Sequence, residues 1–439
     1  MATKKKQTSV QVTDGLQNVV ANLGTGRDKA ASSVYVDLFF SPAQLLTMYR
    51  NSWLARSIVD LPAEDATRKW RKWRAPAEQI TKLERLEKKL KVKSKVKAAK
   101  IAARLYGGAA VYMNTETQDQ SSELKPGREE IRSLVVLTTN NLTAEQFVTD
   151  INSQYFGRPE HYFLTTGGNA DRVRIHASRL VIFQGADLPD DAMNLALINK
   201  WGDSVLQSCM DAIRQTDSTM ANIASLVFEA KVDVMKFKGF AEMLANEAND
   251  ALIIRRLTNQ AAMKGINGAL VIDAEDDYEQ KNASFGGLPE IATKFMDCVS
   301  GASRIPVTRI FGRAAVGMSG SGDGDERVYF DRVGDEQSDM GEAMEILDEC
   351  LIMQALGSRP DKVYYEWSPL RQLTETERAD IFSKTATAAR ALAGGMEPII
   401  PLDALSDSVV NELVEQGMLP GLEVAIAKYG SREEQGIIE

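Results

Sequence analysis

Residues 303–333 read SRIPVTRIFGRAAVGMSGSGDGDERVYFDRV, and this stretch decides how the rest of the chain is interpreted. A helical pattern runs into the stretch and stops at Pro306, because proline lacks the amide hydrogen that a helix interior needs. A longer helical pattern leaves it from Asp325. Between them, Gly312 to Gly324 holds five glycines in thirteen residues, so the backbone can reach positive φ at many points and has few side chains to bury. We predict an exposed, flexible loop between two helices.

Two ligand-binding motifs fail to fit this loop. A phosphate-binding turn needs a strand before it and a fixed glycine spacing, whereas the segment before Gly312 has a helical pattern. A calcium loop needs the pattern D-x-[DN]-x-[DN]-G, which Asp323-Gly-Asp-Glu-Arg327 breaks at the third ligand. The loop is therefore either a plain surface connection or a segment that lines another structure.

A pair of helices is predicted on either side of a small α/β segment. Apolar residues recur at nearly seven-residue spacing from Leu206 to Val227, and a second stripe runs from Ile291 to Ala302. The first helix, over 204–230, would be ~40 Å long at ~1.5 Å per residue. One narrow stripe on so long a helix buries little surface within a single chain. The pattern favours packing among several copies of the same helix.

The residues around the glycine-rich loop resemble the tailed-phage portal protein family. The shared pattern is Arg304-Ile-Pro-x-Thr-Arg-Ile-Phe-Gly312, then the loop around Gly317-Met318, then Asp325-x-Arg-x-Tyr-x-Asp-Arg332. Phrases at 55–65, 102–113 and 369–379 are also similar to segments of this family. The resemblance covers roughly residues 40–420, and the order of its parts agrees with the order of the predicted elements.

The resemblance implies an α+β, mainly helical portal fold with wing, stem, clip and tunnel-loop parts, assembled as a ring. The expected parts, in chain order, are a flexible N-terminal arm (1–33), the wing (34–202), a first stem helix (203–230), the clip (231–287), a second stem helix (288–304), the tunnel loop (305–325), a long wing helix (326–360) and a C-terminal wing or crown region (361–439). Residues expected to face the channel from the tunnel loop are Gly312, Arg313, Gly317, Met318, Ser319, Gly320, Ser321, Gly322 and Asp323.

The function implied by the resemblance is a conduit for double-stranded DNA at one capsid vertex, used for packaging and for ejection. The expected partners are further copies of the chain, typically twelve in a ring, the major capsid and scaffolding proteins, the large terminase subunit, the head–tail connector or adaptor, and the DNA. The expected locations are the virion and, during assembly, the host cytoplasm. No catalysis, cofactor or metal is implied.

The cysteines, the N-terminus and the apolar runs indicate the cellular compartment in which the protein is expected. The three cysteines, Cys209, Cys298 and Cys350, lie in helical patterns and form no C-x-x-C pair, which favours free thiols in a reducing compartment. The basic N-terminus is followed by no apolar run, so we expect no secretory signal. No stretch approaches 18 apolar residues, so we expect no membrane partner.

Residues 66–104 are strongly basic, with fifteen Lys or Arg and three Glu, although the whole chain has a net charge of −9. Interleaved tryptophans would suit a nucleic-acid grip through phosphate contacts and stacking. Alternatively, Leu83, Leu86 and Leu90 form a helical stripe, which makes the lysines its solvated face. Contact with acidic parts of a neighbouring copy is a third interpretation. The candidate contact residues are Lys69, Arg71, Lys72, Lys93, Lys95 and Lys97.

The segment 323–349 is the most acidic part of the chain, with eleven Asp or Glu and two Arg. Carboxylates repel phosphates, so an acidic helix beside a duplex would keep DNA from sticking to a channel wall. The alternative is a solvated acidic helix with no such role.

An enzymatic interpretation depends on the only two histidines, His161 and His176. His176-Ala-Ser178 fits one copy of the H-x-[ST] motif of certain phosphodiesterases, but His161-Tyr-Phe163 does not supply the second copy. The acid–base pair of such an enzyme is therefore incomplete, and we expect His176 to be a hydrogen-bonded structural residue.

Overall fold

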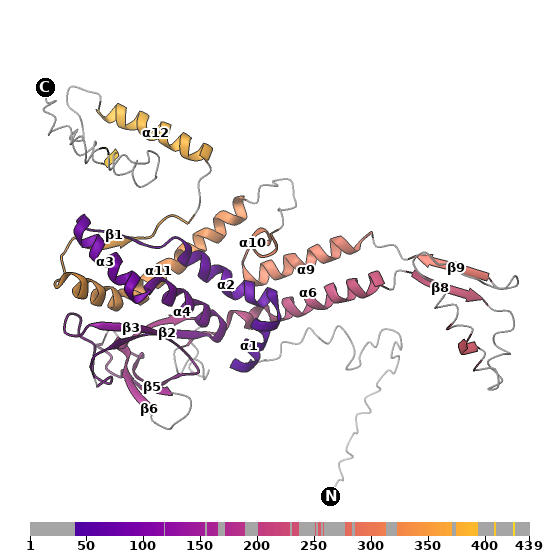
Figure 1. Ribbon diagram of the computed structural model, residues 1–439, viewed down its shortest axis with the longest axis horizontal. Coiled ribbons are helices and arrows are strands. Elements are labelled where there is room, and N and C mark those ends of the chain that lie inside the picture. Colours follow the sequence, from indigo (N-terminus) through magenta and orange to yellow (C-terminus); the bar gives the residue numbers. More distant parts are fainter. Residues whose placement is uncertain are drawn as a thin grey trace, which may run out of the picture. The chain divides into compact units, whose positions relative to one another are not determined.

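The computed structural model describes residues 40–117, 119–153, 156–165, 172–188, 201–228, 231–236, 251, 253–255, 258, 277–282, 286–312, 323–370, 375–393, 408–409 and 425. The chain divides into two units, Met1–Ser368 and Pro369–Glu439. The second unit contains helix α12 (Glu375–Ala393). All other named elements belong to the first unit and are shown in Figure 1.

The first unit begins with two helices, α1 (Pro42–Asn51) and α2 (Trp53–Arg68). The sequence Ser41-Pro42 predicts a helix start, and the apolar residues after it predict one continuous helix ending near Pro62. Ser41 does cap α1, because its hydroxyl accepts from the Gln44 amide at 3.3 Å and the Gln44 side chain accepts from the Ser41 amide at 2.8 Å. The prediction of one continuous helix is wrong. The chain restarts at Ser52, and α2 carries Pro62 inside it.

The lysine-rich segment forms two helices, α3 (Ala77–Leu90) and α4 (Val92–Tyr106). They are separated at Lys91, whose φ of 56° lies in the left-handed region. The predicted apolar stripe is present on both sides of this break, since Leu83, Leu90 and Val92 are buried. Helix α4 continues directly into the central strand of a sheet.

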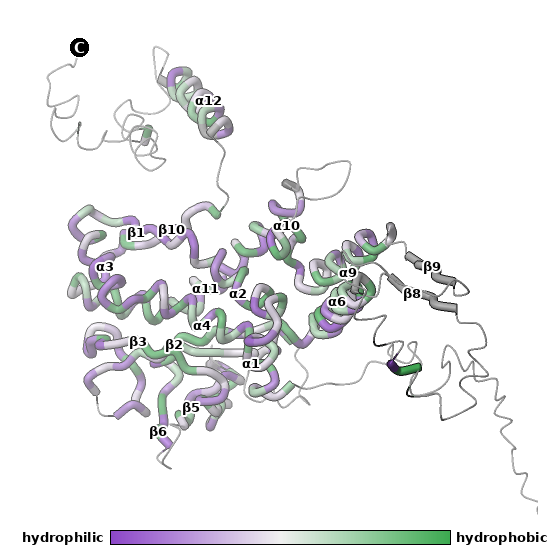
Figure 2. Tube along the Cα trace, turned by 45° about the vertical axis from the view of Figure 1, so that its right-hand side comes forward, coloured by the Kyte–Doolittle hydropathy of each residue, from purple (hydrophilic) through white to green (hydrophobic). Residues whose placement is uncertain are grey.

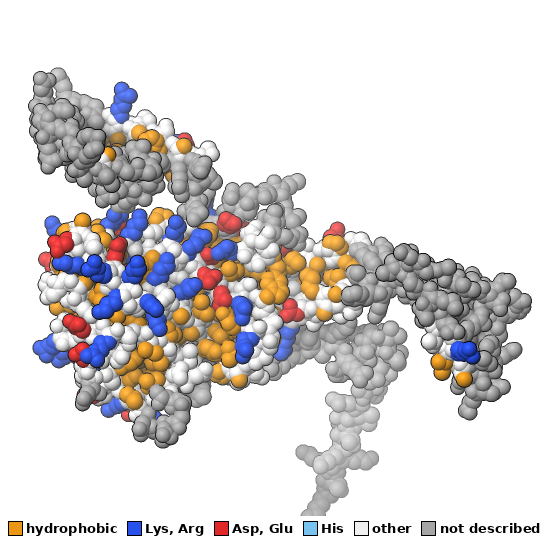
Figure 3. Space-filling model, viewed as in Figure 1, with side chains coloured by type: hydrophobic (Ala, Val, Ile, Leu, Met, Phe, Trp, Pro, Cys, Tyr) orange, Lys and Arg blue, Asp and Glu red, His pale blue; other side chains and the backbone are white. Residues whose placement is uncertain are grey.

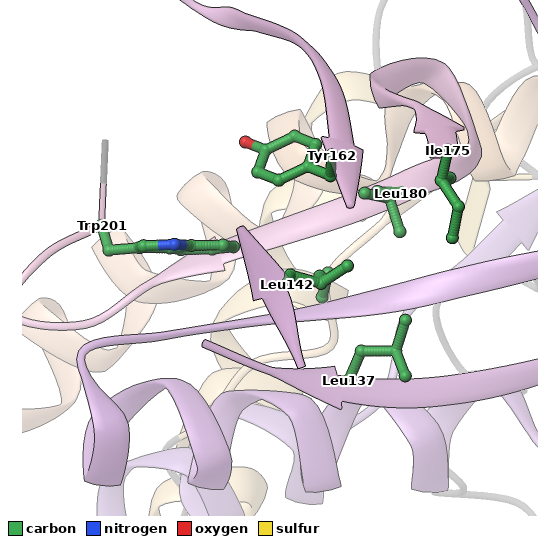
Figure 4. Packing of buried hydrophobic residues seen from close by; sticks show 7 residues of the cluster. Leu137, Leu142, Tyr162, Ile175, Leu180 and Trp201 are labelled. Carbon is green, nitrogen blue, oxygen red and sulfur yellow. The ribbon is translucent and has the colours of Figure 1, made fainter. Parts of the chain in front are cut away.

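Two antiparallel sheets enclose the main apolar core of this part. One has the order β3-β2-β7, with β2 (Gly108–Thr115), β3 (Ile131–Thr138) and β7 (Leu180–Gln184); the other has the order β4-β5-β6, with β4 (Leu142–Phe147), β5 (Pro159–Thr165) and β6 (Arg172–His176). Both contribute to one cluster, which Figure 4 shows: Ala110, Leu137, Leu142, Tyr162, Ile175, Leu180 and Trp201. A Cβ at Gly108 would overlap the Trp201 ring, so this position requires glycine.

Arg179 fixes the loop that covers this core. It lies in the short 3₁₀ turn η2 (Ala177–Arg179) and is fully buried. Its guanidinium donates to both carboxylate oxygens of Glu129, at 2.9 and 3.0 Å, and to the carbonyl of Ser122 at 2.9 Å. These bonds hold residues 122–129 against the sheet.

Helices α6 (Val205–Phe228) and α9 (Leu288–Ser303) run side by side, as both Figure 1 and Figure 2 show. Thr216 lies at the contact, and its hydroxyl donates to the carbonyls of Ala212 and Phe295. Strands β8 (Lys231–Lys236) and β9 (Asp277–Asn282) follow α6 and precede α9, and they pair antiparallel. Within α6, the buried residues stop at Thr216, and most of the side chains described beyond it are exposed. The two helices predicted on either side of the small α/β segment are present, and among the described residues the outer half of α6 has little cover.

The unit closes with α10 (Val307–Phe311), α11 (Asp323–Leu356) and β10 (Tyr364–Glu366). Strand β10 pairs with β1 (Lys72–Arg74). Helix α11 packs against α2, α3 and β7, so it joins the N-terminal helices to the first sheet. Among the described residues, no helix has the length and hydropathy of a membrane-spanning segment.

Candidate functional site at the base of the glycine-rich loop

The glycine-rich loop leaves α10 at Gly312 and enters α11 at Asp323. Gly312 has a φ of 63°, the left-handed conformation that ends many helices at glycine. The predicted helix start at Asp325 was two residues late, and the expected loop 305–325 contains the short helix α10. Seven of the predicted channel-facing residues lie outside the described residues: Arg313, Gly317, Met318, Ser319, Gly320, Ser321 and Gly322.

Both flanks of the loop are bound to one carboxylate, Asp65 of α2. Arg309 of α10 donates to it twice, from Nε at 3.0 Å and from Nη2 at 2.6 Å. Tyr329 of α11 donates its hydroxyl at 2.8 Å. The Asp65 side chain is 1% exposed, so these three bonds replace the water that the charge has lost. We name Asp65, Arg309 and Tyr329 the loop-base triad.

Burial sets the protonation of this triad. Burial, together with the charge of Asp65, raises the pKa of Tyr329. The hydrogen bonds to Asp65 raise the pKa of Arg309 as well. Near neutral pH the tyrosine is therefore protonated and the arginine charged, so both side chains act as donors to Asp65.

Aromatic and backbone contacts extend the loop base on both sides. Trp53 of α2 meets Phe311, the last residue of α10, edge to face with ring centroids 5.6 Å apart. Gln337 of α11 donates to the carbonyl of Ala66 at 2.8 Å. A third link is Glu336, which pairs with Arg104 of α4 at 3.1 Å. The two ends of the loop thus start from a firmly packed platform.

Sequence reasoning missed this triad because its members are 244 and 264 residues apart along the chain. Arg309 and Tyr329 both belong to the pattern that carries the family resemblance, and Asp65 ends the phrase at 55–65. The signal in the sequence that could have pointed to the triad is that each of its three polar residues lies beside the apolar stripe of a predicted helix. Only the fold shows that they meet.

The candidate contact residues of the lysine-rich segment occupy quite different positions. Lys72 is exposed on β1, and Lys69 and Lys95 are half-buried. Lys93 donates to the carbonyl of Arg68, and Lys97 pairs with Glu64 at 3.4 Å. Two of the candidate lysines, Lys93 and Lys97, are thus bonded to other groups of the same chain.

The structure corrects the prediction that Arg71 is a contact residue on the surface. Arg71 is buried, with ion pairs to Glu87 at 2.7 Å and to Asp348 at 2.6 Å. The rings of Trp73 and Tyr365 lie 4.7 and 4.4 Å from its guanidinium carbon. Arg71 therefore joins β1, α3, α11 and β10 inside the protein, and its position does not fit a contact with DNA or with another subunit.

Two exposed charged surfaces remain, and each lies within one of the charged segments that the sequence marked, 66–104 and 323–349. The basic face consists of Arg85, Lys88, Lys89 and Lys91 on α3 and its C-terminal cap. In Figure 3, Lys and Arg side chains gather over the part of the surface where α3 and α4 lie in Figure 1. The acidic stripe lies on the solvent side of α11 and consists of Asp331, Asp335, Asp339, Glu342 and Glu345.

The two histidines lie side by side, which the sequence did not reveal. His161 and His176 are register partners on β5 and β6, and their ring centroids are 5.1 Å apart. Nδ1 of His176 accepts from the amide of Ser178 at 3.2 Å and lies 2.8 Å from its hydroxyl. Burial and the neighbouring His161 lower the pKa of His176, so its ring is neutral near pH 7. A hydrogen-bonded role within the sheet accounts for these contacts.

Comparison with known proteins places these features in context. A family model described as "Phage portal protein" matches residues 43–391. Two relatives, each named anti-CBASS protein Acb1, come from Caulobacter sp. (strain RHG1) and Sphingomonas paeninsulae; they are 39% and 34% identical to this chain. The matches cover 96% and 94% of this chain, and 70% and 67% of those proteins. An uncharacterized protein of Haemophilus influenzae is 29% identical, covering 94% of this chain and 92% of that protein.

Solved structures agree with the fold. A chain from the neck of a native gene transfer agent particle, computed with C12 symmetry, is 14% identical and has a TM-score of 0.51. The match covers 81% of this chain and 93% of that chain. A chain from the neck of the empty particle, computed with C6 symmetry, gives a TM-score of 0.52 at 14% identity, over 78% of this chain and 90% of that chain. The predicted mainly helical α+β fold is confirmed.

Proposed function

The chain belongs to the phage portal protein family, and from that membership we propose that it forms a ring of identical copies, twelve as is typical of the family, at one capsid vertex. Each copy would present one surface to a different surface of the next copy, and such contacts close into a ring when the rotation allows. The hollow axis of the ring would carry double-stranded DNA during packaging and ejection.

The order of the described elements supports this proposal. The helix pair α6 and α9, with the strands β8 and β9 between them in the chain, precedes α10, the glycine-rich loop and α11. We assign the stem to α6 and α9, the clip to the segment that contains β8 and β9, and the tunnel loop to the segment after Gly312. The outer half of α6, with little cover in one chain, suits a helix that packs among copies of itself.

The loop-base triad supports a channel-facing role for the loop. A loop that touches passing DNA needs ends that are held in fixed positions. Asp65 binds Arg309 before the loop and Tyr329 after it. Asp325 and Glu326, the exposed acids at the start of α11, would repel phosphates, so the DNA would not bind where this end of α11 faces it. The expected partners outside the ring are the large terminase subunit, the head–tail connector, and the capsid and scaffolding proteins.

The observation that carries the proposal is the family match over residues 43–391. Electron microscopy of the purified full chain tests it. We expect closed rings with a central opening. Particles that stay monomeric at every concentration and salt condition, with or without scaffolding protein, would overturn the ring and the channel together.

A second candidate function is phosphodiester hydrolysis, in view of the H-x-[ST] motif at His176 and the adjacency of His161 and His176. A pair of neighbouring imidazoles could act as acid and base on a phosphodiester. Hydrolysis of bis(p-nitrophenyl) phosphate by the pure protein, lost in both His161→Ala and His176→Ala, would support this function. Equal rates for wild type and both variants would exclude the pair as its source.

A further inference from the structure

We propose that the basic face of one copy binds the acidic stripe of the next copy. This inference rests on the ring described under Proposed function and names the surfaces that would meet in it. The two surfaces are the Arg85, Lys88, Lys89 and Lys91 set on α3, and the Asp331, Asp335, Asp339, Glu342 and Glu345 set on α11.

The basic face is a concentration of unneutralised charge. Most other cations of residues 66–104 are engaged within the chain: Arg71 and Arg74 pair with acids of distant segments, and Lys100 pairs with Glu336. By contrast, Arg85, Lys88 and Lys89 form no ion pair with any residue that the structure describes. Lys88 and Lys89 follow Arg85 at spacings of three and four residues, so all three lie on one side of α3. Their mutual repulsion favours an anionic partner.

The acidic stripe is the matching feature. Its five residues recur every three or four positions, which places them along one side of α11. The opposite side is buried and includes Val333, Met340, Met344 and Leu347. Within the described part of the chain, none of the five carboxylates has a cationic partner. A row of like charges over almost four helical turns stays solvated in one copy, and a cationic surface would neutralise it.

The two surfaces cannot meet inside one copy. Helices α3 and α11 pack against each other, with Leu83 of α3 and Ile352 of α11 in one apolar cluster. Arg71 further bonds Glu87 of α3 to Asp348 of α11 at that contact. Both charged surfaces lie on the sides of their helices away from this packing, so they face outward in different directions. Only a second copy can bring them together.

This geometry is head-to-tail. Each copy presents a cationic surface on one side and an anionic surface on another, so every copy can satisfy two neighbours in the same way. Contacts of that type close into rings rather than stopping at a dimer. Complementary charge also sets the register and suppresses wrong partners, because like charges brought together across an interface cost several kcal/mol.

The test uses two charge-reversed variants of the full chain. The acid-only variant carries Arg85→Glu, Lys88→Glu and Lys89→Glu; the base-only variant carries Asp331→Lys, Asp335→Lys and Asp339→Lys. Each variant alone would bring like charges together, so we expect a loss of ring fraction of more than about tenfold. Mixed in equal amounts, the two should form rings in which they alternate, because each surface of one complements a surface of the other.

The controls separate this inference from the ring itself and from folding. A matched variant, Lys125→Glu with Arg128→Glu, reverses two exposed charges in a different loop and should form rings as wild type does. Circular dichroism spectra of all variants should match wild type, which shows that the subunit fold is kept. If wild type forms no rings, the proposed function fails before this test begins.

Two outcomes would overturn the inference while wild type still forms rings. One is that either variant forms rings alone. The other is that the mixture fails to do so. A further result would assign the basic face to nucleic acid instead: the acid-only variant keeps its rings but loses salt-dependent binding of a DNA duplex.

Discussion

The carboxylate of Asp65 lies 2.6 Å from Nη2 of Arg309, and this ion pair joins α2 to the last helix before the glycine-rich loop. The same carboxylate binds Tyr329 on the far side of the loop. A single buried charge therefore determines where both ends of a thirteen-residue glycine-rich segment, Gly312 to Gly324, are held.

Asp65→Asn should loosen both flanks of the loop. The amide keeps the shape of the side chain but leaves Arg309 with no anion. Because Arg309 is 37% exposed, solvent screens part of this loss, and we expect a cost of about 1–2 kcal/mol. We expect that loss in urea denaturation, with faster proteolysis between residues 303 and 333. The matched control is Lys97→Ala, which removes an exposed pair with Glu64 and should cost under about 1 kcal/mol. Wild-type stability and proteolysis for Asp65→Asn would show that the triad is not structural.

Arg71→Lys should destabilise the first unit without a specific effect on DNA. Lysine cannot bond Glu87 and Asp348 together in the arginine geometry or stack its plane on Trp73 and Tyr365. We expect a loss of about 2–4 kcal/mol in the free energy of unfolding. Lys72→Ala, an exposed neighbour, is the control and should be near neutral. A wild-type melting temperature for Arg71→Lys, coupled with weaker duplex binding, would restore Arg71 as a DNA contact.

Low pH should reduce the free energy of unfolding, because it protonates Glu129, the partner of Arg179. The hydrogen bonds from Arg179 are the main reason that the pKa of Glu129 falls from 4.5 to about 2. A carboxyl with a depressed folded-state pKa contributes stability that is full above its unfolded value and is lost as the proton binds. We therefore expect the free energy of unfolding to fall between about pH 4.5 and pH 2. In Glu129→Gln this part of the pH dependence should be absent; an unchanged profile would show that the carboxylate does not stabilise the fold.

Deletion of Gly317 to Gly324 should separate assembly from genome handling. If the segment lines the channel, its removal leaves the subunit contacts in place, so rings should still form, while DNA packaging or genome retention falls. Electron microscopy and a packaging assay in phage-producing cells measure the two effects. Loss of rings in the deletion would instead assign the segment a role in assembly.

Local sequence rules predicted the elements better than their junctions. The Ser41 cap, helices α6 and α9 and the long helix after the loop follow from capping residues and apolar spacing, which are local properties. The break at Lys91 and the passage of α2 through Pro62 do not, because tertiary packing decides them. A lysine in the left-handed region has no sequence signature of the kind that glycine provides.

Charged residues were the hardest to place from sequence. A run of lysines and arginines predicts a solvated or binding surface, yet Arg71 lies inside because Asp348 meets it from 277 residues away. The pairing of His161 with His176 escaped in the same way, since it depends on the register of two strands. Side chains whose partners are distant in the sequence are invisible to rules that use spacing alone.

Helix α2 contacts α6 as well as α10 and α11. Sixteen residues of α-helix form a rod of ~24 Å at ~1.5 Å per residue. Helix α2 therefore connects α6 directly to the loop-base triad, and a force applied along α6 would reach both ends of the loop through this one short helix. We therefore expect that tension on the outer end of α6 also displaces the loop.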